Sequence, residues 1–95
     1  DYMAPEQIRS AGHVDLRADI YALGVMAFQM LTGQVPFKAE NPGAVMLAHL
    51  QTPPPDPRLL ARGIPDHSAL AILRSLQKSP GDRFSSAGDM MKAFS

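Results

Sequence analysis

The hydrophobic positions of this chain recur at helical spacing, and Pro and Gly residues separate the helical stretches. The strongest stretch runs from Arg17 to Leu31 and is followed by Gly33, which suits the residue after a helix end. Its central part, Ile20 to Phe28, is apolar on every side, as is typical of a helix buried on all sides. A chain of this size has too little other material to wrap such a helix.

Other helices are predicted around this central one, and no segment has a convincing strand pattern. They cover Pro5 to Ser10, Asn41 to Gln51, Asp66 to Lys78 and Ser86 to Phe94. Gln34 to Glu40 is predicted to be a loop, and the proline-rich run Thr52 to Pro57 an extended linker. The sequence therefore predicts an all-α fold of about five helices.

The composition is that of a small globular domain, with 45% hydrophobic and 19% charged residues among 95. Nine basic residues offset nine acidic ones, so nothing steers the chain toward nucleic acid or anionic lipid. The absence of cysteine excludes disulfides, thiolate metal sites and a cysteine nucleophile. The chain begins at Asp1 without an initiator methionine, which predicts that it is a piece of a longer protein.

The residues by themselves offer no self-contained catalytic site. His13, His49 and His67 lie in different segments without metal-ligand spacing, which favours satisfied or solvent-facing imidazoles. No glycine-rich phosphate loop or Gly-x-Ser-x-Gly elbow is present. The proline run is interpreted as a stiff connector rather than a ligand of an SH3 or WW groove. Methionines on helical faces are predicted to fill the core rather than to form a binding surface. They are Met26, Met30, Met46, Met90 and Met91.

Four short motifs nevertheless occur in a recognisable order. They are Ala4-Pro5-Glu6, Asp19-Ile20-Tyr21-Ala22-Leu23-Gly24, Leu31-Thr32-Gly33 with Pro36-Phe37, and Asp82-Arg83-Phe84. With these motifs the chain closely resembles the C-terminal half of a protein kinase domain, in the style of bacterial serine/threonine kinases of eukaryotic type. The resemblance covers residues 1–95 and implies a partial kinase domain, from the end of the activation segment to the last helix of the large lobe.

The resemblance implies scaffold roles for three charged residues. Glu6 and Arg83 match a buried ion pair, whereas the plainer alternative is two exposed charges in turns. Asp19 matches a carboxylate that accepts hydrogen bonds from the backbone of the catalytic loop. Its plainer alternative is an anion placed favourably near a helix N-terminus.

Two further groups are assigned by the same resemblance. Tyr2, Met3 and Ala4 match the pocket for the residue after the phosphorylated hydroxyl, with a frayed terminus as the alternative. A second group lies on the helix that kinases commonly use to dock substrates and regulators, with ordinary packing as the alternative. It consists of Val45, Met46, Leu47 and Leu50.

The motifs that perform phosphoryl transfer in a kinase are not in this sequence. ATP and Mg²⁺ are therefore implied for the complete kinase and not for this piece, which is expected to be inactive alone, weakly stable and prone to associate. The implied partners are protein substrates and the N-terminal kinase portion, and the implied location is the cytoplasm, with membrane anchoring left open. The alternative function is a non-catalytic helical interaction module or pseudokinase remnant.

Overall fold

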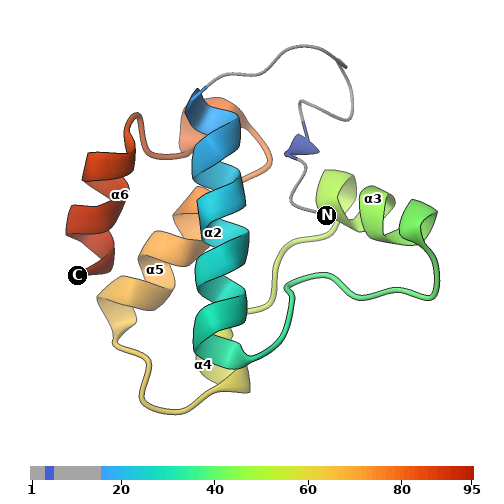
Figure 1. The fold of residues 1–95 in the computed structure, drawn as a ribbon, viewed down its shortest axis with the longest axis horizontal. Coiled ribbons are helices and arrows are strands. Elements are labelled where there is room, and N and C mark those ends of the chain that lie inside the picture. Colours follow the sequence, from blue (N-terminus) through green and yellow to red (C-terminus); the bar gives the residue numbers. More distant parts are fainter. Residues whose placement is uncertain (1–3, 6–15) are drawn as a thin grey trace.

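The computed structural model describes residues 4–5 and 16–95, and these residues form helices and connecting segments without a strand (Figure 1). In chain order the elements are α2 (Leu16–Thr32), α3 (Pro42–Gln51), α4 (Pro57–Leu60), α5 (Asp66–Ser75), the 3₁₀ turn η1 (Pro80–Asp82) and α6 (Ala87–Phe94). Helix α2 packs against α5, and α5 packs against α6, whereas α3 lies to one side of these three and meets α2 through His49. The predicted all-α fold is confirmed for the residues described. None of these helices combines the length and the apolar character that crossing a membrane requires.

Helix α2 extends the predicted central helix by one residue at each end, and α3 is capped by Asn41. Oδ1 of Asn41 accepts a hydrogen bond from the backbone N–H of Ala44 at 2.8 Å. Ser86 likewise caps α6 by accepting a hydrogen bond from the N–H of Asp89. The helix predicted over residues 5–10 lies outside the described residues, apart from Pro5.

Two predictions about helix bounds were wrong. Helix α5 ends at Ser75 and not at Lys78, because the carbonyls of Gln77 and Lys78 turn to the buried guanidinium of Arg83. The sequence also predicted no helix at α4, which directly follows the proline-rich linker. A proline at the first helical position and an aspartate cap are enough for this single turn.

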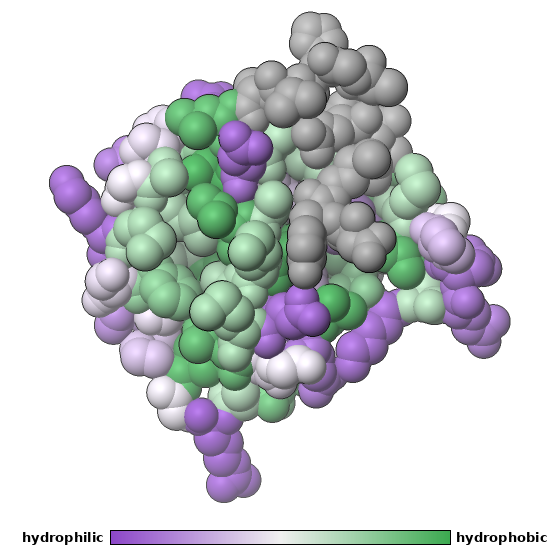
Figure 2. All heavy atoms as spheres, in the orientation of Figure 1, coloured by the Kyte–Doolittle hydropathy of each residue, from purple (hydrophilic) through white to green (hydrophobic). Residues whose placement is uncertain are grey.

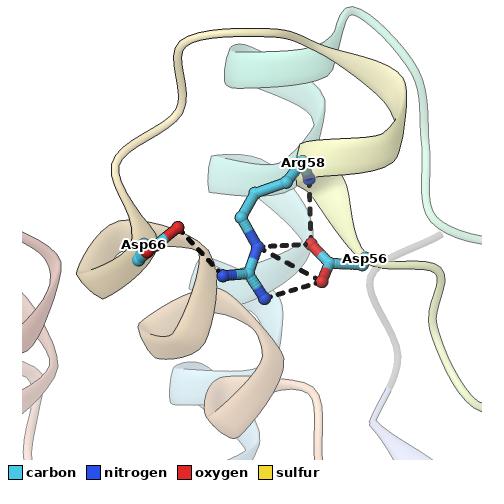
Figure 3. A network of polar contacts seen from close by, with 3 residues as sticks. All are labelled: Asp56, Arg58 and Asp66. Atoms are coloured by element: carbon cyan, nitrogen blue, oxygen red, sulfur yellow. Dashed lines mark hydrogen bonds and ion pairs between the residues drawn. The ribbon is translucent and has the colours of Figure 1, made fainter.

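Helix α4 is tied to the start of α5 by one arginine (Figure 3). The side chain of Asp56 accepts the backbone N–H of Arg58 at 2.9 Å and pairs with its guanidinium at 2.7 Å. The other side of the same guanidinium donates to Asp66 at 3.0 Å. Because these groups are partly or largely exposed, the network contributes little to the stability of the fold. Its main effect is to fix how α4 lies relative to the start of α5.

The core lies between α2 and α5. Its main cluster contains Ala4, Ala18, Tyr21, Val25, Phe28, Ile72 and Leu76. A second cluster joins both helices to α6 through Ile20, Ala71, Phe84 and Met90. The close approach of α2 and α5 requires a glycine, because a Cβ atom at Gly24 would lie 2.8 Å from the Cβ of Ser75.

The opposite side of α2 is apolar and exposed, as the small size of the chain led us to expect. Figure 2 shows hydrophobic residues gathered over α2 and between α2 and α6. An apolar groove of about 270 Å³ lies there, lined by residues such as Leu23, Met26, Met30 and Met91. The prediction that the methionines fill the core was wrong, since of those described only Met90 is buried. The other described methionines are exposed, with Met26, Met30 and Met91 on this groove and Met46 on α3.

Candidate scaffold and docking site

Arg83 follows η1 and is almost fully buried, with 2% of its surface exposed. Its Nε donates to the carbonyl of Gln77 at 2.8 Å, Nη1 to that of Arg17 at 3.0 Å, and Nη2 to that of Lys78 at 3.2 Å. The guanidinium also lies over the ring of Tyr21, 4.8 Å from its centroid. The orientation of this cation is therefore fixed by the start of α2 and by the segment after α5.

Glu6, the expected partner of Arg83, lies outside the described residues, so the predicted ion pair stays a prediction. The two residues that precede it are described. Ala4 and Pro5 are buried, and Ala4 belongs to the same core cluster as Tyr21. The chain that precedes Glu6 is thus anchored in the core cluster that contains Tyr21.

The other residues assigned from the resemblance near the chain start are placed only in part. Tyr2 and Met3 lie outside the described residues, whereas Ala4 has no exposed surface. Asp19 is exposed in the first turn of α2. Its position suits both the favourable end of the helix dipole and contact with a further chain segment.

Helix α3 presents apolar side chains to solvent. Met46 and Leu47 are 43% and 52% exposed, while Val45 and Leu50 are half-buried. All four predicted docking residues therefore keep accessible surface, and their role in docking stays a prediction.

His49 is the one buried residue of α3. Its Nδ1 lies 2.7 Å from the hydroxyl of Tyr21 on α2, and its ring meets the ring of Phe37 edge-on at 4.8 Å. Burial, together with the charge of Lys78, lowers the pKa of His49 to about 4. The imidazole is therefore neutral at pH 7 and shares a hydrogen bond with the Tyr21 hydroxyl.

Lys78 also attaches α3 to the rest of the structure. Its Nζ lies over the ring of Phe37 at 4.2 Å and donates to the carbonyl of Ala48 at 3.2 Å. Burial and the neighbouring charge of Arg83 lower the pKa of Lys78 to about 8. We call the resulting run of contacts the cation–aromatic column; it consists of Arg83, Tyr21, His49, Phe37 and Lys78.

Sequence reasoning named Arg83 and the docking helix but missed the column that joins them. The interpretation of His49 as a satisfied imidazole is confirmed by its hydrogen bond to Tyr21. No metal centre accompanies the column, since the described part of the chain holds no group of three His, Cys, Asp or Glu residues suited to a metal ion.

Comparison with known proteins places these features in a family. Residues 1–93 match the protein kinase domain family. The chain is 42% identical over 89 residues to serine/threonine-protein kinase PksC of Streptomyces coelicolor, covering 94% of this chain and 16% of that protein. It is 48% identical over 86 residues to serine/threonine-protein kinase Pkn1 of Myxococcus xanthus, covering 90% and 12%. For serine/threonine-protein kinase PrkC of Bacillus subtilis the identity is 37% over 89 residues, covering 94% and 14%. The chain thus spans less than a fifth of the length of these relatives.

Proposed function

Because this chain belongs to the protein kinase domain family, we propose that it is part of a serine/threonine kinase that transfers the γ-phosphate of ATP to protein hydroxyls. Its similarity to bacterial serine/threonine kinases supports this substrate class. Residues 1–95 then form a partial kinase domain that acts where ATP is available, in the cytoplasm. The observation that supports the proposal is the buried Arg83, whose guanidinium donates to the backbone carbonyls of Gln77, Arg17 and Lys78. The resemblance matches this residue to the scaffold cation of the family.

Within such a kinase this segment acts as scaffold and contains no residue that performs the chemistry. A buried guanidinium needs a carboxylate to offset its desolvation, and Glu6 supplies that charge in our proposal. The pair fixes the end of the activation segment against the core. Asp19, exposed at the head of α2, accepts hydrogen bonds from the catalytic-loop backbone. ATP and Mg²⁺ are bound by the other parts of the kinase domain.

The substrate meets this segment at two places. Tyr2, Met3 and Ala4 form the pocket for the residue that follows the acceptor hydroxyl, and the buried Ala4 anchors that pocket. Helix α3 docks proteins through a set of partly exposed apolar residues. This set consists of Val45, Met46, Leu47 and Leu50. The N-terminal part of the kinase domain covers the exposed apolar side of α2.

A second candidate function is a non-catalytic interaction module, and the exposed apolar surface of α3 favours it. In that case α3 holds a partner while no phosphate is transferred. The two functions differ in whether the full gene product incorporates phosphate from ATP.

The test is transfer of radiolabelled phosphate from ATP to myelin basic protein by the full gene product. We expect incorporation on serine and threonine, and we expect Asp19→Ala to reduce it strongly while leaving the folded state intact. Leu59→Gln is the matched control, because Leu59 on α4 is 82% exposed and outside every contact described above. Absence of incorporation with an intact fold would overturn the kinase proposal and favour the interaction module.

A further inference from the structure

We propose that a groove between residues 35–42 and α3 binds an extended segment of a protein substrate, by taking an apolar side chain that is flanked by Lys or Arg. The groove measures about 550 Å³. It is hereafter the α3 groove, and the residues used in the argument are Val35, Phe37, Glu40, Pro42, Val45 and Met46. The inference rests on the proposed kinase function for the kind of partner and adds the chemistry that this partner must have.

The floor of the α3 groove is fixed before any partner binds. Phe37 is 5% exposed and contacts both the ring of His49, in an edge-on geometry, and the Nζ of Lys78. The side chain of Asn41 caps α3 and so fixes the wall that carries Val45. A preformed groove of this kind costs little ordering when a partner enters it.

The lining of the α3 groove selects an apolar side chain. Met46 and Val45 from α3 face the groove together with Val35 and Pro42 from the preceding segment. Methionine adapts to side chains of different shape, so the groove accepts more than one apolar residue type. The exposed part of Met46, 43% of its surface, becomes buried only when a partner is bound.

The charge at the rim selects the residues beside that side chain. Glu40 is exposed, is the charged member of the groove lining and forms no ion pair within residues 4–5 and 16–95. The nearest cation along the chain, Lys38, donates instead to the side chain of Gln34. His49 is neutral at pH 7, and the ammonium of Lys78 lies against the Phe37 ring and donates to the carbonyl of Ala48 rather than to Glu40. A basic residue next to the apolar one therefore completes the electrostatic match.

The apolar groove between α2 and α6 lacks this charge. It is lined by Leu, Met, Ala and Phe side chains alone and gives no preference for a charged flank. We assign that groove to coverage by the rest of the kinase domain. Of these two grooves, only the α3 groove combines an apolar floor with a carboxylate that has no ion pair among the described residues. The two surfaces are thus separable by experiment.

The test uses the full gene product on an array of peptides that carry Leu or Phe at the centre. One half of the array has Arg and Lys beside that residue, and the other half has Asp and Glu at the same places. We expect retention on the basic half to be about fivefold stronger, and we expect Glu40→Gln to remove and Glu40→Lys to reverse that preference. Met46→Asp should reduce retention on both halves.

Leu59→Asp, on an exposed position outside the α3 groove, is the matched control and should retain peptides as the native protein does. Equal retention on the two halves, or an unchanged preference in both Glu40 variants, would overturn the proposal. Phosphate incorporation into myelin basic protein is measured on the same samples. If the native protein incorporates no phosphate but keeps the preference for basic peptides, the kinase function is refuted. The α3 groove is then a peptide-binding site without kinase activity. The array carries peptides only, so binding to membranes or nucleic acid does not contribute to the retention.

Discussion

The hydroxyl of Tyr21 and Nδ1 of His49 lie 2.7 Å apart and join α2 to α3 across 28 residues of sequence. Since His49 is the one buried residue of α3, this hydrogen bond connects the proposed docking helix to the core. The same tyrosine ring carries the guanidinium of Arg83 on its face. Arg83 and α3 therefore contact the same side chain, that of Tyr21.

The contact between Tyr21 and His49 makes the free energy of unfolding depend on pH in the acidic range. The pKa of His49 is about 4 in the folded chain and 6.5 as a free group, so the unfolded chain binds the proton first as the pH falls. The stabilisation is complete above pH 6.5 and is lost as the pH falls to about 4. We expect a loss on the order of 1 kcal/mol, because solvent screens part of the shift.

Urea unfolding of the full gene product across this pH range measures the loss, and His49→Gln should flatten the profile. An NMR titration of the imidazole Cε1–H signal that disappears in His49→Gln should give a midpoint near 4. Lys78 does not change the stability in this acidic range. Its pKa is about 8 in the folded chain and 10.5 as a free group, so its effect on the free energy of unfolding falls between these two pH values. A His49 midpoint near 6.5 would contradict the expectation.

Arg83 is the residue whose removal we expect to be most damaging. Arg83→Ala leaves the carbonyls of Gln77, Arg17 and Lys78 without their donor. Together with the loss of an ion pair to Glu6 this should cost about 3–5 kcal/mol. In a double-mutant cycle with Glu6→Ala, measured by urea unfolding of the full gene product, the two losses should be far from additive. Additive losses of less than about 1 kcal/mol would remove the Glu6–Arg83 assignment.

The sequence predicted the long helices well because their signals are local. Asn41 and Ser86 are side chains that cap the helix that follows them, and the structure shows both caps. The end of α5 was missed because it depends on Arg83, which lies outside the helix. No local sequence pattern shows that its guanidinium binds the carbonyls of Gln77 and Lys78. Helix α4 was missed because four residues are too few to show a period.

Only those residues of the candidate site that belong to a sequence motif were predictable. The motifs named Arg83 and Asp19, and the structure places the first in the core and the second at the surface. The cation–aromatic column was not predictable, because its members come from separate segments and carry no common spacing. The isolated histidine on an otherwise apolar helix was the one signal that pointed to His49 as an internal contact.

Gly24 tests the packing of α2 on α5. Alanine is the better helix former by about 1 kcal/mol, so Gly24→Ala would stabilise a free helix. Here its Cβ would meet the Cβ of Ser75 at 2.8 Å and Leu76 at 3.2 Å, and we expect a net loss of about 1–3 kcal/mol. The matched control is Gly88→Ala in α6, where the nearest atom lies at 3.8 Å. Urea unfolding should show the control unchanged or stabilised, and a stabilising Gly24→Ala would contradict the close approach.

The exposed side of α2 leads to the last expectation, which concerns the 95-residue chain by itself. Met30 is 81% and Met91 is 56% exposed beside the same apolar groove, and an apolar surface of this kind favours association. Sedimentation velocity should show a mass that rises with concentration. Met30→Gln and Met91→Gln should shift the chain toward the monomer, whereas Leu59→Gln, outside the groove, should not. A sharp unfolding transition that is independent of concentration would contradict this expectation, and it would mean that the chain buries enough of α2 without further kinase elements.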